Sequence, residues 1–316
     1  MKIALALLLV ATSAQAQPFP SHALRFVVPF PPGGGMDIVA RTVGEKLAPR
    51  LGQPVVIDNK PGAGTMIGTD AVAKSAPDGY TLLVSGIASQ AIVHHMHPKR
   101  SFDMQRDFAP VARIGDGTIA FVVPQSSRAN SVRDFVALAR QNPGKMTFAS
   151  SGVGGIIHLT GEMFKQAAGI DLVHVPYKGT TQILPDILDG RVDLALDSVP
   201  AYLPHIQSGK VRVFAVASRT RSALLPDLPT MAEAGVPGVV AATDYALYAP
   251  AGTPREIVMR LYRDTAAVLE NPDLRAKLAA QIIEIHGGTP EALQAELADE
   301  IVKWGRIIQA AKITVE

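Results

Sequence analysis

The sequence lacks cysteine entirely, although it is 316 residues long. This absence excludes disulfide bonds, thiolate nucleophiles and thiolate metal ligands. Aromatic residues are scarce, at 5% of the chain, and no run of basic residues occurs, so we expect no nucleic-acid partner. The 47% of hydrophobic residues are enough for a core that needs no covalent cross-links.

Several catalytic signatures are missing as well. The sequence has no Gly-x-x-x-x-Gly-Lys-Ser/Thr string, no Gly-x-Ser-x-Gly string and no His-Glu-x-x-His string. These absences exclude a P-loop, the commonest signature of exported hydrolases and a zinc-protease helix. We therefore expect a protein that is not an enzyme and that needs neither a cofactor nor a metal.

The amino terminus has the pattern of a secretory signal. Lys2 precedes an apolar run over 3–10, and Ala14-Gln15-Ala16 supplies small residues at the positions that signal peptidases prefer. The apolar run is too short to span a bilayer. We predict a signal peptide over 1–16, cleavage after Ala16 and export to the periplasm.

The remaining chain alternates between strand-like and helix-like segments, which is the pattern of an α/β fold. Strands are predicted over 24–30, 53–58, 80–84, 111–123, 146–150, 171–177, 191–197, 211–217 and 241–248. Helices are predicted over 38–47, 66–74, 131–141 and 156–168, with a helical pattern from 254 to 311. Asp37, Ser131 and Thr253 are predicted N-caps.

Two glycine-rich turns are the most informative feature. Gly33-Gly34-Gly35 and Gly152-Val153-Gly154-Gly155 each stand between a predicted strand and a predicted helix. Glycine allows the main chain to approach a ligand closely, and a helix start presents unpaired N–H groups and a partial positive charge. Such turns bind anions, carboxylates included. Two of them suggest two lobes that hold one small anionic molecule.

Two other functions remain open at this point. Ser151 and His158 are candidates for a hydrolytic pair, although helix capping explains His158 without catalysis. His94, His95 and His97 are candidate copper or zinc ligands, although a polar loop explains them equally simply. We favour the simpler interpretation of both groups.

The turns belong to a longer series of strings. Motifs at 29–37, 59–64, 76–83, 150–154 with His158, 174–179, 227–235, 249–254 and 303–304 occur in a fixed order over the chain. In these strings the sequence resembles the Bug-type extracytoplasmic solute receptors, the TctC-like periplasmic binding proteins of tripartite tricarboxylate transporters. Each string alone is modest, but their order is specific.

The resemblance implies a two-lobed periplasmic-binding-protein fold of type II, the Venus-flytrap arrangement. Each lobe is then a mostly parallel sheet flanked by helices, and two crossing strands form the hinge. The implied division is a first lobe over 17–122, a second lobe over 123–243 and a return to the first lobe over 244–316. The carboxy-terminal helices are expected to pack on the first lobe.

The resemblance also implies a function. A monomeric receptor would bind a small carboxylic acid, either an organic acid or an acidic amino acid, and deliver it to the membrane permease subunits of the transporter or to a sensor kinase. Glycine N–H groups would bind the carboxylate, Asp37 would orient the first turn, Thr180 would offer a hydroxyl, and Asp197 would face the far end of the ligand. The expected ligand-binding residues are Phe30, Gly33, Gly34, Met36, Asp37, Ser151, Gly152, Gly154, Gly155, Thr180 and Asp197.

Three departures from the family pattern bear on the ligand. The family often has serine at Gly155, glycine at Thr65 and tryptophan near 243–245. Asp197 and Asp244 would favour a ligand with a cationic group if they reach the site. The alternative is that both bond to backbone at strand ends, and for Asp244 we prefer this alternative.

Overall fold

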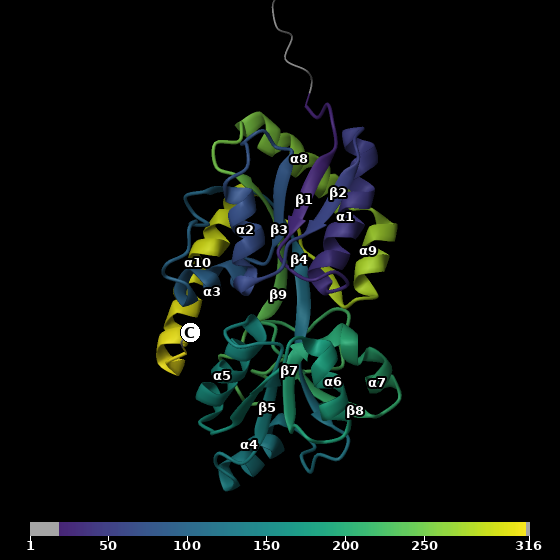
Figure 1. Cartoon of the computed structure of the whole chain (residues 1–316). Coiled ribbons are helices and arrows are strands. Elements are labelled where there is room, and N and C mark those ends of the chain that lie inside the picture. The colour runs from purple at the N-terminus through teal and green to yellow at the C-terminus, as the bar shows by residue number, and fades with distance from the viewer. Residues whose placement is uncertain (1–18, 314–316) are drawn as a thin grey trace, which may run out of the picture.

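The structure is a computed structural model that describes residues 19–313. The predicted signal peptide and its cleavage site lie outside these residues. Figure 1 shows two lobes, one above the other, joined by the long strands β4 (Phe108–Pro124) and β9 (Ala242–Pro250). Among residues 19–313, no helix combines the length and the hydropathy that a membrane-spanning segment requires.

The first lobe is built on a sheet with the strand order β2-β1-β3-β9-β4. Strand β1 pairs in parallel with β2 and β3, whereas β9 is antiparallel to both β3 and β4. A short strand, β10, pairs antiparallel with β4. The bounds of the strands not yet given are β1 Leu24–Val28, β2 Val55–Asn59, β3 Thr81–Ser85 and β10 Ile283–Ile285.

Helices cover both faces of this sheet, and the side chains of strand β1 point alternately to the two faces. Phe26 and Val28 pack with α1, α8 and α9, whereas Val27 points to the face covered by α2, α3 and α10. Because both faces are buried, the strand reads as a continuous apolar run. The bounds are α1 Gly35–Leu51, α2 Met66–Ala73, α3 Ile87–Met96, α8 Arg255–Leu269, α9 Pro272–Ala279 and α10 Pro290–Ala311, with a 3-10 turn, η1, over Ala63–Thr65.

The second lobe, like the first, contains three neighbouring parallel strands. Its sheet has the order β6-β5-β7-β4, with β5 parallel to both β6 and β7, and β8 paired to β4. The strands are β5 Thr147–Ser150, β6 Val173–Pro176, β7 Leu194–Ser198 and β8 Val211–Val216. The helices are α4 Val132–Gln141, α5 Ile156–Ala168, α6 Thr180–Leu188 and α7 Leu203–Gln207, with a 3-10 turn, η2, over Val199–Tyr202.

The predicted α/β architecture is confirmed, but three details differ. The sheets are mixed, because every strand that pairs with β4 or β9 is antiparallel to it. The expected continuous helical pattern after residue 254 is interrupted by β10. Helix α8 begins at Arg255 with Pro254 as its N-cap, because the Thr253 hydroxyl donates to the Pro250 carbonyl (2.8 Å) instead of capping the helix. The division at 122/123 and 243/244 stays a prediction.

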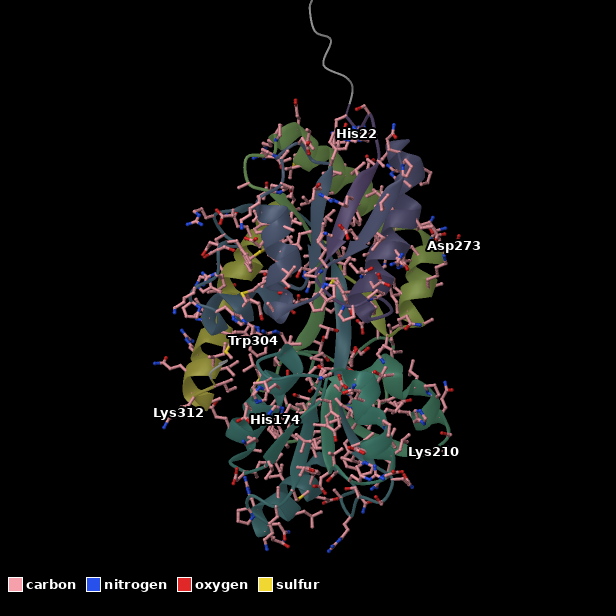
Figure 2. The ribbon with its side chains drawn as sticks, in the orientation of Figure 1. His22, His174, Lys210, Asp273, Trp304 and Lys312 are labelled. Atoms are coloured by element: carbon pink, nitrogen blue, oxygen red, sulfur yellow. The ribbon has the colours of Figure 1, made fainter. Side chains whose placement is uncertain are left out.

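Helix α10 departs most from expectation. It packs against α3, as expected for the first lobe, but it also contacts α5 of the second lobe. Trp304 on α10 is fully buried in a cluster that contains residues of α3 and of α5, and Figure 2 shows this side chain at the level where the lobes meet. The carboxy-terminal helix therefore bridges the two lobes.

Candidate functional site

The two glycine turns occupy equivalent places in the two lobes. The first follows β1, which lies between β2 and β3, and the second follows β5, which lies between β6 and β7. Figure 1 shows the arrow of β1 pointing toward the second lobe and the arrow of β7, which is parallel to β5, pointing toward the first. Ligands of open α/β sheets bind at such carboxyl ends.

The first turn leaves helix N–H groups free. Gly33 has φ +83°, a left-handed conformation that favours glycine, and Gly34 is the N-cap of α1 with φ −80° and ψ 169°. The N–H of Ile38 donates to the Gly34 carbonyl (3.0 Å), which begins the helical hydrogen bonding. The helical N–H groups before it, starting at Gly35, therefore point out of the helix end.

Asp37 supports this turn, although it is not the N-cap that the sequence predicted. The helix begins at Gly35, so Asp37 is its third residue, and its Oδ2 accepts hydrogen bonds from the Gly33 N–H (2.9 Å) and from Arg41 Nε (3.0 Å). Burial acts to raise the pKa of Asp37, but the hydrogen bonds from Arg41 and Gly33 outweigh it and lower that pKa. An ionised Asp37 thus fixes the turn from behind.

The second turn has the same geometry with a different acceptor. Gly154 has φ +74°, and Gly155 is the N-cap of α5 with φ −79° and ψ 168°. The N–H of Leu159 donates to the Gly155 carbonyl (3.0 Å), and His158 Nδ1 accepts from the Gly154 N–H (3.0 Å). His158 therefore takes the place that Asp37 has in the first turn.

The two turns differ in charge. His158 must be unprotonated at Nδ1 to accept the Gly154 N–H. Its burial, with smaller contributions from His174 and Lys165, lowers the pKa of His158 to about 4. At neutral pH the second turn therefore has a neutral acceptor, whereas the first has a carboxylate paired with Arg41.

The other predicted residues of the turns lie beside these groups. The Phe30 carbonyl accepts from Asn59 Nδ2 (3.1 Å), which ties the first turn to the end of β2. Met36 is buried in the core on the α1 side, so its N–H and not its side chain belongs to the turn. Ser151 is partly exposed, and the Gly152 N–H donates to Ser150 Oγ (3.3 Å).

Thr180 and Asp197, both predicted to bind the ligand, are hydrogen-bonded to each other. Asp197 is 1% exposed and accepts hydrogen bonds from the Ser198 N–H (2.7 Å), Thr180 Oγ1 (3.1 Å) and Tyr202 Oη (3.0 Å). The Thr180 hydroxyl is thus used within the lobe. Burial raises the pKa of Asp197. Its donors come from its own lobe, so Asp197 stabilises the turn after β7, and its contact with the far end of a ligand stays a prediction.

Asp244 takes the backbone-bonding alternative. Its carboxylate accepts a hydrogen bond from the Ile87 N–H, and its Oδ2 accepts one from the Ala88 N–H (3.0 Å). Asp244 therefore occupies the amino-terminal end of α3. Burial, with the negative charge of Asp116, raises the pKa of Asp244 to about 8. The end of α3 is therefore closed to an external anion.

Sequence reasoning missed Tyr245 as part of the first turn. A Cβ built on Gly35 would stand 2.7 Å from the Tyr245 hydroxyl, so a larger residue there would require the end of the Tyr245 side chain to move. The hydroxyl also lies 3.4 Å from Thr243 Oγ1, which donates to the Gly117 carbonyl (3.1 Å). The sequence did contain an indication of this role, because 243–245 is one of the segments that depart from the family pattern.

The other two departures lie at helix starts. Gly155 is an N-cap, a position where serine would add a hydroxyl acceptor. Thr65, the N-cap of α2, has φ +83° in the left-handed region, where a β-branched residue is strained and glycine is not. Both helices begin directly after the departing residue, α5 at Ile156 and α2 at Met66.

The structure does not bring together the candidate hydrolytic pair. His158 Nδ1 is used by Gly154, and the serine–histidine contact that does form joins Ser150 Oγ and His174 Nε2 (2.7 Å). Ser150 is fully buried, so this pair has no access to a substrate. An exposed nucleophile beside a base is what hydrolysis requires.

Two of the three histidines at 94–97 are engaged elsewhere. His94 and His95 lie on α3 and not in the expected loop. Arg100 Nη2 lies 2.8 Å from His94 Nδ1, and His95 Nε2 lies 2.7 Å from the Ile301 carbonyl of α10. Within residues 19–313, no three histidine, aspartate or glutamate side chains are grouped so that they could hold a metal ion.

Two cavities lie outside the glycine turns. One of about 580 Å³ opens between α4, α5 and the end of α10, and one of about 260 Å³ lies behind the crossing strands, between the loop at 218–222 and α10. Neither has a residue of either turn in its walls. We therefore base the candidate site on the helix ends and not on these cavities.

Comparisons with known proteins find one family over most of the chain. The family model of the tripartite tricarboxylate transporter family receptor, TctC, matches residues 39–313. Protein BugT of Bordetella pertussis is 36% identical over 301 residues, which cover 95% of this chain and 92% of BugT.

Solved structures with bound acids are similar over nearly the whole chain. The Rhodopseudomonas palustris protein Rpa4515 with adipate has a TM-score of 0.85 and 36% identity, covering 94% of this chain and 99% of that one. MatC from the same organism, with bound malate, has a TM-score of 0.80 and 29% identity, covering 92% and 100%.

Proposed function

The chain belongs to the tripartite tricarboxylate transporter receptor family, TctC, and from this premise we propose that it captures a small carboxylic acid between its two lobes in the periplasm. The observation that carries the proposal is the matched pair of glycine turns. Each presents helix N–H groups at the carboxyl end of a strand that has a parallel neighbour on both sides. Closing the lobes would bring both turns onto one ligand, a motion common in binding proteins.

Main-chain groups would supply most of the recognition. The amides of Gly34 and Gly35 in the first lobe and of Gly155 and Ile156 in the second are the expected carboxylate donors. The partial positive charge at both helix ends adds to them. The adipate and malate of the similar solved structures are small carboxylic acids of the kind proposed.

The receptor would bind its ligand without changing it. No exposed nucleophile stands beside a base at the two turns, and the buried Ser150–His174 contact serves the turn itself. The closed form would present surfaces of both lobes to the membrane permease of a tripartite transporter. Delivery to a sensor kinase is the alternative within the same class. The signal peptide over 1–16 would direct export and would be removed by cleavage after Ala16.

A thermal-shift experiment tests capture of a carboxylic acid. Adipate or malate at about 100 times its dissociation constant should add about 2.7 kcal/mol to the stability of the mature protein. For a chain of this size the midpoint should rise by about 5 °C. Adipamide, which has the length of adipate without its charges, is the matched control and should give no shift. Equal shifts with adipate and adipamide, or none with a panel of small organic acids, would contradict the proposal.

A further inference from the structure

A pair of stacked imidazoles lies under the second glycine turn. His174 on β6 and His158 on α5 face each other with ring centroids 3.8 Å apart and 10° between the planes. The Phe148 ring extends the stack, with its centroid 4.9 Å from that of His174. His174 lies in one of the strings shared with the family, yet no role was predicted for it. Figure 2 labels it within the second lobe.

Each ring bonds to a different end of the turn. His158 Nδ1 accepts from the Gly154 N–H (3.0 Å), and His174 Nε2 lies 2.7 Å from Ser150 Oγ. The Ser150 hydroxyl donates to the Gly152 carbonyl (3.0 Å). Because a hydroxyl has one proton to donate, His174 Nε2 must carry the proton in its contact with Ser150. A chain of hydrogen bonds thus runs from His174 through Ser150 to Gly152.

We propose that His174 is a positioning residue for ligand capture, because it holds the second glycine turn in its anion-binding shape through Ser150 and through the stack with His158. The inference rests on the proposed function, since the turn is the proposed receptor in the second lobe. His174 itself does not touch the ligand. It acts by fixing the direction of the Gly152 carbonyl and, through His158, of the Gly154 N–H.

Burial and a neighbouring cation keep the stack neutral. Lys165 on α5 is the cation that faces both rings, and it is paired with Glu162 (3.0 Å) on the same helix. Burial and Lys165 lower the pKa of His174 to about 4. A protonated His158 would turn its Nδ1 into a donor facing the Gly154 N–H, so acid should release the turn.

The sign of the pH dependence follows from these values. The unfolded chain takes up protons on histidine near pH 6.5, whereas the folded stack takes them up near pH 4. The unfolded state therefore binds more protons between these values, and folding stability falls as the pH falls from 6.5 to 4. At neutral pH both histidines are mostly unprotonated in the folded and the unfolded chain, so their titration does not lower the folding stability.

Four variants test the hydrogen-bond chain. His174→Phe keeps a stacking ring but loses the bond to Ser150. Ser150→Ala removes that bond together with the Ser150–Gly152 hydrogen bonds, and His174→Gln keeps an N–H donor. His174→Phe and Ser150→Ala should each speed amide exchange at Gly152 and Gly154 of the unliganded protein, and weaken adipate binding, about tenfold. The double variant should be no worse than Ser150→Ala alone, because His174 acts on the turn through the Ser150 hydroxyl. His174→Gln should stay within about threefold of the wild type.

The controls separate this inference from the proposed function. His205→Phe on α7 of the same lobe should change neither measurement. If the wild type binds no organic acid, the proposed function fails, while exchange at Gly152 and Gly154 still tests the positioning of the turn. Losses that multiply to about a hundredfold in the double variant, or unchanged exchange in His174→Phe, would overturn the role of His174.

A pH titration of the unliganded protein adds a spectroscopic signature. The Gly154 amide resonance should shift with an inflection near pH 4 in the wild type. His158→Asn, whose side-chain oxygen can accept the same N–H without titrating, should lack this inflection. An inflection near pH 6.5 in the wild type would mean that the stack does not hold its rings neutral, and would also overturn the inference.

Discussion

Replacing Gly34 with valine should abolish carboxylate binding, with a loss of at least about a hundredfold in affinity, while the unliganded protein stays folded. Gly34 has φ −80°, a conformation that valine adopts readily, and a Cβ there would meet only the Pro31 carbonyl, at 3.7 Å. The fold therefore has room for the side chain. The valine side chain would, however, occupy the space in front of the α1 amides, where a carboxylate must come within hydrogen-bond distance.

Gly155→Val makes the same test in the second lobe. Gly155 has φ −79°, and its added Cβ would meet only the Gly152 carbonyl, at 3.8 Å. Titration calorimetry with adipate measures the affinity, and urea unfolding without ligand measures the stability. Equal loss from the two variants is expected if one ligand bridges both turns.

Gly52→Ala is the matched control, because it lies at the opposite end of α1. Gly52 has φ +68°, so alanine is strained there although nothing fills the space around it. This variant should lose about 1 kcal/mol of stability and keep its affinity, which is the reverse of the valine variants. Retained binding in both valine variants would show that the site lies elsewhere.

Trp304→Ala should have the largest effect on stability, a loss of about 3–5 kcal/mol in the free energy of unfolding. The Trp304 side chain is fully buried, and its Nε1 donates to Glu300 Oε2 (2.5 Å). It belongs to the cluster that joins α10 to α3 of one lobe and α5 of the other. Truncation leaves a cavity where the two lobes meet, so the loss includes packing from both.

Val302→Ala gives the control on the same helix. Val302 is 53% exposed, so its truncation should cost less than about 0.5 kcal/mol. Urea unfolding of both variants, followed by circular dichroism, measures the difference. A loss below about 1 kcal/mol in Trp304→Ala would contradict a shared core between the lobes.

The glycine turns could be predicted because their cause is local. Gly33 and Gly154 have positive φ, and the adjoining helix starts follow from the sequence just after them. The sequence predicted the roles of side chains near the turns less well. Asp37 satisfies the turn from the third helical position, whereas its place in the sequence indicated the N-cap.

Contacts between distant segments set the limits of prediction. Asp197 ends a strand, and only the fold places Thr180 and Tyr202 beside its carboxylate. The apolar face of α10 indicates a buried helix but not that its partners come from two lobes. Strand β10 has three residues, too few for a periodic pattern to reveal.

The central claim is that main-chain amides at the starts of α1 and α5 together hold one carboxylic acid. A crystal structure of the mature protein with adipate, or with the acid that gives the largest thermal shift, tests it most directly. The claim predicts carboxylate oxygens within about 3 Å of amide nitrogens from both turns, Gly34–Gly35 and Gly155–Ile156. An acid bound with both sets of amides directed away from it would contradict the claim.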